Sequence, residues 1–210
     1  KGNPSRKAFY EQIAAFAALH AAHPDTMMYL HTDMGVNGGD VVNLPKFIKR
    51  MGLKIGEDVI FADPYMYGLG YPDAYMVDAY NAMDALTNVS LGEGFGIPII
   101  EAQACGTPVI VGDWTSMGEL CFAGWKIDKA EAIPIYHDYY DAFQWQAITA
   151  AICDRMEQAY AARDNYELRN KARRGALPYD ADDVTRQYWK PVLKEMEQII
   201  KDKSATSFEQ

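Results

Sequence analysis

Residues 91–108 read LGEGFGIPIIEAQACGTP and join a glycine-rich turn to the start of a helix. Gly94 and Gly96 let the backbone approach a ligand closely, and the proline that follows suits the first turn of a helix. A helix N-terminus presents unpaired N–H groups that attract anions such as phosphate. Glu93 and Glu101 stand on either side of it, and their carboxylates can accept hydrogen bonds from hydroxyl groups. The stretch therefore predicts a site for a phosphorylated sugar compound.

Short apolar segments alternate with helical segments on both sides of this stretch. Strands are expected at residues 27–32, 58–62, 85–89 and 107–111, and helices from Ser5 onward and at residues 44–51, 72–83, 97–105 and 116–122. The alternation contains no hairpin signal, which indicates an α/β fold with a parallel sheet covered by helices on both faces. Ligands of such sheets bind beyond the carboxyl ends of the strands, where the two glutamates fall.

The chain changes character near residue 144. Residues 1–143 carry the alternating pattern and form the predicted ligand-binding domain. Helices with polar faces are expected to follow over residues 144–163, 166–176 and 181–202, so we predict that residues 144–202 are helical and pack on the first part. Residues 203–210 are expected to be a disordered tail.

The charge of the chain excludes one class of partner. A formal net charge of −9 argues against a nucleic-acid-binding surface, because phosphate contacts need clustered Lys and Arg. The notable basic cluster comprises Arg169, Lys171, Arg173 and Arg174. We interpret it as a solvated helix face, and a peripheral contact with a membrane surface is the alternative.

The cysteines and the lengths of the apolar runs indicate the cellular location to expect for the chain. Cys105, Cys121 and Cys153 are widely spaced and form no Cys-x-x-Cys pair, so neither a disulfide framework nor a zinc site is expected. No apolar run reaches membrane-spanning length, and the first residues lack the apolar core of a signal peptide. A cytoplasmic location is therefore expected, with membrane association as the alternative.

These motifs resemble the group 1, retaining glycosyltransferases of the GT-B fold, which have two facing Rossmann-like domains. The match is to the C-terminal, donor-binding domain and spans nearly the whole chain. The residues that carry it are Glu93-Gly94-Phe95-Gly96, Glu101-Ala102, Gly106 and Pro108-Val109-Ile110. The resemblance implies a Rossmann-like parallel sheet with helices on both faces, followed by C-terminal helices. The family's domain begins with a strand that this chain lacks.

The resemblance also assigns roles. Glu93 would lie beside the donor sugar and Glu101 would bind the ribose hydroxyls. The backbone N–H groups of Gly94, Phe95, Gly96 and Ile97 would meet sugar hydroxyls or the distal phosphate. Arg6 and Lys7 would neutralise the diphosphate, with a residue before Arg6 as the alternative for the arginine. Pro64 and Tyr65 follow a strand end where relatives contact the base, and an ordinary surface turn is the other interpretation.

The implied reaction is transfer of a hexosyl group from a nucleoside diphosphate sugar to an acceptor hydroxyl, with retention at the anomeric carbon. The basic pair and the helix N-terminus would stabilise the departing diphosphate without a metal or other cofactor. The partners would be the nucleotide sugar and an acceptor-binding N-terminal domain. Tyr188 and Trp189 of the last helix would either brace that domain or pack on the chain's own sheet.

Three other functions share a feature with this pattern. A non-catalytic nucleotide or sugar-phosphate binding module and a nucleotide-sugar epimerase of the same fold both remain open. A retaining glycoside hydrolase is disfavoured, because its two carboxylates flank the bond at about 5 Å and usually come from separate strands. The base, the sugar and the acceptor are not identified by the sequence.

Overall fold

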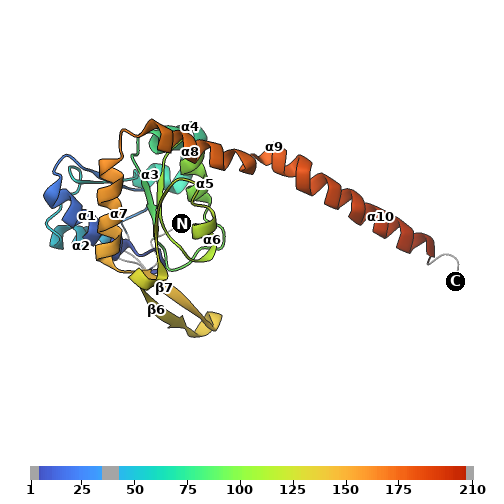
Figure 1. Cartoon of the computed structure of the whole chain (residues 1–210), viewed down its shortest axis with the longest axis horizontal. Helices are drawn as coiled ribbons and strands as arrows, with labels where there is room; N and C mark the ends of the chain where they lie inside the picture. The colour runs from blue at the N-terminus through green and yellow to red at the C-terminus, as the bar shows by residue number, and fades with distance from the viewer. Residues whose placement is uncertain (1–4, 35–42, 207–210) are drawn as a thin grey trace.

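The computed structural model describes residues 5–34 and 43–206 and shows parallel strands between two layers of helices (Figure 1). Strand β1 (Met28–Leu30) pairs with β2 (Val59–Phe61). A second group has the order β3-β4-β5, formed by Leu86–Asn88, Val109–Gly112 and Gly124–Ile127. All these pairs are parallel, which confirms the predicted fold class. The strands nevertheless fall into two ladders rather than one.

The helices cover both faces of the strands. Helices α1 (Phe9–Ala22) and α7 (Thr149–Ala161) pack together on one side, and α5 (Ile97–Ala104) packs with α8 (Tyr166–Ala176) on the other. The remaining short helices of this body are α2 (Leu44–Arg50), α3 (Pro64–Leu69), α4 (Asp73–Asn81) and α6 (Thr115–Glu119). Pro64 and Tyr65, for which a surface turn was one interpretation, are the first residues of α3.

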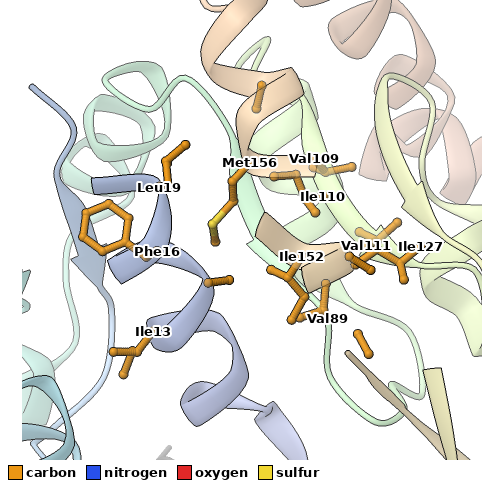
Figure 2. Close-up of a cluster of buried hydrophobic side chains, with 14 of the residues drawn as sticks. Ile13, Phe16, Leu19, Val89, Val109, Ile110, Val111, Ile127, Ile152 and Met156 are labelled. Atoms are coloured by element: carbon orange, nitrogen blue, oxygen red, sulfur yellow. The ribbon is translucent and has the colours of Figure 1, made fainter. Parts of the chain in front are cut away.

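The core lies between these layers. Figure 2 shows Ile152 and Met156 of α7 lying between α1 and the side chains of β4, among them Ile110. All four residues of β4, which read VIVG, are buried, because a strand covered on both faces must be apolar on both. Gly124 has φ +136°, and a Cβ there would lie 1.9 Å from the Val109 carbonyl oxygen. Only glycine therefore fits where β5 begins.

An antiparallel hairpin projects from the body and corrects the sequence prediction (Figure 1). Its strands are β6 (Ala132–His137) and β7 (Ala142–Ala147), and Asp141 in the turn has φ 46°. The expectation of no hairpin was wrong, and so was the helix expected from residue 144, because α7 begins at Thr149. The aromatic and β-branched residues of this segment favour a strand, but their spacing also continued the helical pattern of α7.

A helical arm ends the described chain and extends away from the body (Figure 1). It consists of α9 (Ala181–Val184), a π-helical segment (Thr185–Trp189) and α10 (Lys190–Thr206). Tyr188 and Trp189 are 64% and 59% exposed, so the interpretation that they pack on the chain's own sheet was wrong. Residues 203–206 are helical rather than disordered, and residues 207–210 lie outside the described residues.

The basic cluster of α8 is a structural brace rather than only a solvated face. Arg169 donates to the carbonyls of Met83 and Asn81 at the end of α4, over 3.0 and 3.1 Å. Arg173 donates to the Ala104 carbonyl at the end of α5. Cations at helix C-termini are stabilising because the carbonyls there are unpaired. Across the described ranges, no helix is long and apolar enough to cross a membrane.

Candidate functional site

Glu93 lies in the loop between β3 and α5, here called the glutamate loop (residues 89–96), and its side chain is 9% exposed. The Lys7 ammonium and the Ser90 hydroxyl donate to Oε1, and Arg6 Nη1 lies 3.3 Å from Oε2. Burial by itself raises the pKa of Glu93. The hydrogen bonds from Lys7 and Ser90, together with the charges of Lys7 and Arg6, outweigh burial, so the pKa is lowered and the carboxylate is ionised at neutral pH.

The two cations belong to a 3₁₀ turn (Ser5–Lys7) that precedes α1. The Arg6 carbonyl accepts from the Leu91 N–H over 2.8 Å, and the Lys7 carbonyl accepts from the Gln12 side chain over 2.7 Å. Buried Ala8 then adopts the left-handed region at φ 53°. Such backbone costs a non-glycine residue about 1–2 kcal/mol, and it is often found at functional sites. The helix predicted to begin near Ser5 therefore starts only at Phe9, and Ser5–Lys7 form a separate basic turn before it.

The first residues of α6, which follows β4, hold the backbone of Glu93. The Glu93 N–H donates to the Thr115 hydroxyl over 3.3 Å, and the Glu93 carbonyl accepts from the Ser116 hydroxyl over 3.1 Å. The Trp114 indole N–H donates to the Ser90 carbonyl over 3.0 Å. Thr115, like Ala8, has a positive φ, of 52°. The conformation of Glu93 is thus set by the glutamate loop together with Trp114 and the start of α6.

Glu101 lies within α5 at the other end of the motif. The Tyr80 hydroxyl donates to Glu101 Oε2 over 2.9 Å. Burial, and then the charge of Glu101, raise the pKa of Tyr80 far above its usual value, so this hydroxyl keeps its proton. His31, at the end of β1, has a pKa lowered by burial, which the negative charge of Glu101 partly opposes. Glu101 is therefore within electrostatic reach of the carboxyl end of β1.

The glycine turn between the glutamates is open. Gly96 adopts φ 95° at the N-cap of α5. A Cβ added at Gly94 would meet nothing within 4 Å. Phe95 and Ile97 are exposed, and the Phe95 ring lies 6.2 Å from that of Tyr179. Gly94, Phe95 and Ile97 can therefore be approached from solvent, whereas Gly96 is buried.

The sequence matches a known protein family over more than half of its length. The family described as "Glycosyl transferases group 1" matches residues 4–135. The chain belongs to this family. The match runs from the basic turn through the glutamate loop and α5 into the β6–β7 hairpin.

Relatives of this group 1 glycosyltransferase domain are longer proteins. The D-inositol 3-phosphate glycosyltransferase of Rhodococcus jostii (strain RHA1) is 34% identical over 107 residues, which are 50% of this chain and 22% of the relative. The uncharacterized glycosyltransferase 335 of Sulfolobus islandicus rod-shaped virus 1 is 30% identical over 110 residues, covering 50% and 33%. The chain therefore spans only part of the length of the curated relatives it matches.

Solved structures share the fold. Anabaena Alr3699/HepE in complex with UDP-glucose has a TM-score of 0.68 at 18% identity, over 92% of this chain and 47% of the other. The C-terminal domain of the glycosyl transferase group 1 family protein LpcC from Francisella tularensis has a TM-score of 0.54 at 19% identity, over 88% and 80%. The GT-B type of fold expected from the motifs is thus confirmed.

An aromatic cluster in this glycosyltransferase domain escaped the sequence analysis. His31 shares a 2.9 Å hydrogen bond with the Tyr29 hydroxyl, and its ring lies 5.2 Å from that of Tyr71. Tyr71 stacks on Tyr75 at 4.3 Å. The signal for this cluster was the repeated tyrosines of residues 65–75.

Pro64 and Tyr65 lie at the start of α3, near this cluster in sequence. Pro64 is the first residue of the helix, and the Asp63 side chain caps it by accepting from the Met66 N–H over 2.9 Å. Tyr65 is 73% exposed, and its side chain has no hydrogen bond or ring contact with any described residue. The structure thus brings Arg6 and Lys7 into contact with Glu93, whereas the Tyr65 side chain contacts neither these residues nor the aromatic cluster. Within the described ranges, no group of three His, Cys, Asp or Glu side chains could hold a metal ion.

Proposed function

We propose that this domain binds a nucleoside diphosphate sugar and forms the donor half of a retaining, metal-independent hexosyltransferase. One observation carries the proposal: the loop and helix after β3 bring together an ionised carboxylate with two cations, an exposed glycine turn and a second carboxylate, which are the groups that such a donor needs. Glu93 holds the two cations, Gly94, Phe95 and Ile97 are exposed, and Glu101 accepts from Tyr80, while Tyr71 and Tyr75 stack in a separate aromatic cluster. Family membership supports the sugar-transfer class.

The aromatic cluster would receive the base. The stacked rings of Tyr71 and Tyr75 offer a flat apolar face. Pro64 and Tyr65, which lie near this cluster in sequence, stay predicted base contacts. Glu101 would then accept hydrogen bonds from the ribose hydroxyls. Tyr80 occupies only one acceptor position of this carboxylate, so others are left for the ligand.

The diphosphate would lie against the N-terminus of α5. The N–H groups of Gly94, Phe95, Gly96 and Ile97 would bind its oxygens or the sugar hydroxyls. Arg6 and Lys7 are held in place by the ion pairs with Glu93, so they would meet the phosphates without reorganising. Glu93, already ionised, would orient the sugar through its hydroxyls.

In the transfer step, the acceptor oxygen bonds to the anomeric carbon as the bond from that carbon to the phosphate oxygen breaks. The attack takes place on the face from which the diphosphate leaves, so the configuration is retained. The acceptor proton passes to the departing phosphate oxygen. Negative charge develops on the diphosphate, and the fixed charges of Arg6 and Lys7 would stabilise it there.

A second domain would supply the acceptor. The helical arm exposes Tyr188, Trp189, Val192, Met196 and Ile200, and a row of exposed apolar side chains marks a contact surface. We place the acceptor-binding domain against this face. The chain by itself is then expected to bind the donor but to transfer sugar poorly.

The proposal is tested by thermal denaturation of the chain with UDP, GDP and ADP sugars. A donor at 100 times its Kd should stabilise the fold by about 2.7 kcal/mol. The Glu101→Gln variant should need more of the same donor for the same shift, whereas Glu119→Gln, on the exposed end of α6, should not. A folded protein that none of these donors stabilises would falsify donor binding.

A further inference from the structure

Thr115, the first residue of α6, has a backbone conformation that β-branched residues rarely adopt. Its φ of 52° lies in the left-handed region, where the Cβ comes too close to the following carbonyl oxygen. Among the described residues, two other non-glycine residues have a positive φ: Ala8, after the basic turn, and Asp141, in the hairpin turn. Strained backbone persists only where the surrounding structure holds it, so neighbouring groups must keep Thr115 in place.

Both chain neighbours of Thr115 are fixed to the glutamate loop. Trp114 is 3% exposed, and its indole N–H donates to the Ser90 carbonyl over 3.0 Å. On the other side, the Ser116 hydroxyl donates to the Glu93 carbonyl over 3.1 Å. Thr115 is therefore held between two anchored residues.

The Thr115 side chain faces the same loop. Its hydroxyl accepts from the Glu93 N–H over 3.3 Å and donates to the Trp114 carbonyl over 2.7 Å. A Cβ added at Gly92 would lie 3.5 Å from the Thr115 methyl, which places this methyl next to Gly92. The Gly92 carbonyl in turn accepts from Arg6 over 3.1 Å. Thr115 thus contacts the part of the loop that carries Glu93 and meets a cation of the site.

We propose that Thr115 is a positioning residue, whose strained backbone is retained because its hydroxyl fixes the Glu93 peptide beside the transferred sugar. The proposal rests on the proposed function, because it concerns the same carboxylate. Glycine would adopt this backbone without strain, but it would leave the Glu93 N–H without this acceptor. Loss of the side chain should therefore lower turnover without lowering the stability of the fold.

The test measures turnover, donor affinity and unfolding temperature in the protein that carries both domains. Thr115→Gly should lower kcat about tenfold, because a group that orients the sugar is displaced, while the Kd for the donor stays within about twofold. Its unfolding temperature should be unchanged or higher, since relief of strain offsets the greater freedom of glycine in the unfolded chain. Thr115→Ser keeps the hydroxyl and should keep kcat within about twofold of the unaltered protein.

Asp141→Gly is the matched control, because Asp141 has a similar φ of 46° and has no part in the donor site. It should likewise keep its unfolding temperature, and its kcat and Kd should be normal. If Thr115→Gly does not fold, Thr115→Ala removes the hydroxyl and keeps the Cβ. Its kcat should then be about tenfold below that of Thr115→Ser.

A measurement without donor tests the hold on Glu93 itself. In the unliganded chain, the pKa of the Glu93 carboxyl can be followed through its ¹³C chemical shift. Thr115→Gly should raise this pKa toward its ordinary value, because the carboxylate is held less well against Lys7 and Arg6. Thr115→Ser should retain the lowered pKa.

The proposal is overturned if both Thr115→Gly and Thr115→Ala keep normal kcat, or if Thr115→Ser loses as much kcat as Thr115→Gly. A Kd that rises as much as kcat falls would make Thr115 a ligand contact and also overturns it, as does an unchanged pKa of Glu93 in Thr115→Gly. Normal turnover by Thr115→Gly refutes this role alone. An unaltered protein that binds and transfers no donor refutes the proposed function and the catalytic role of Thr115 together.

Discussion

Glu93 and Glu101 occupy the two ends of one glycine-rich motif, but the fold holds them differently. Glu93 is nearly buried, and both carboxylate oxygens are bonded to groups from the start of the chain and from its own loop. Glu101 receives a single hydrogen bond, from Tyr80. A buried charge needs compensating partners, whereas a half-exposed one is partly solvated by water.

This difference separates a preorganised end of the site from an adaptable one. The charges around Glu93 are in position before any ligand binds, which is the arrangement that stabilises developing charge in a transition state. Glu101 keeps acceptor capacity for hydroxyls, which suits ground-state binding. We therefore expect substitutions at the two glutamates to separate turnover from affinity.

The largest expected effect is on turnover. In the protein that carries both domains, Glu93→Gln should lower kcat by about 100–1,000-fold, comparable to the loss of one preorganised electrostatic contact, while donor affinity changes little. The measurement is release of nucleoside diphosphate, with Glu119→Gln as the control that should keep kcat. An equal loss of kcat in Glu101→Gln would break the distinction between the two ends.

The next effect concerns stability and pH. Because the pKa of Glu93 is lowered in the fold, its ionic contribution is complete above its ordinary value of about 4.5 and is lost as the pH falls through the lowered value. Glu93→Gln should cost about 1.5–3 kcal/mol of unfolding free energy at pH 7. Denaturant titrations should show this deficit shrinking below pH 4.5. A deficit that is the same at pH 3 and pH 7 contradicts the ion-pair argument.

A smaller effect is expected at the other end of the motif. Glu101→Gln should raise the Kd for the donor about tenfold, equivalent to about 1.4 kcal/mol, because a carboxylate accepts more strongly from hydroxyls than an amide does. Its kcat should stay within about twofold of the unaltered enzyme. Calorimetric titration of the donor provides the measurement, and unchanged affinity would remove Glu101 from the ribose site.

The smallest effect tests the open turn between the glutamates. Gly94→Ala should leave the unfolding free energy within about 0.5 kcal/mol, since the added methyl meets nothing within 4 Å. The same methyl should weaken donor binding about threefold if the ligand approaches this backbone. Gly68→Ala in α3 is the matched control, because its Cβ also meets nothing. Equal donor affinity in both variants would move the ligand away from Gly94.

Local pattern predicted the elements whose signals are contained within them. Pro98, Gly106 and the apolar run after it define α5 and β4, and the structure has these elements within one or two residues of the prediction. The hairpin was missed because the residues of β7 fit both a strand and the helix that follows. Their conformation is decided by pairing with β6 and by the hydrogen bond between Trp145 and Leu91.

The sequence by itself determined the α/β class, the family and the positions of the two glutamates, because glycine, proline and apolar spacing act through local sterics and burial. The tertiary structure alone decided what each glutamate contacts. Arg6 and Lys7 meet Glu93 across more than eighty residues, Tyr80 meets Glu101 across twenty-one, and Gln146 meets Glu11 across 135. Such pairs form where the packing of strands and helices brings distant loops together, so no local pattern encodes them.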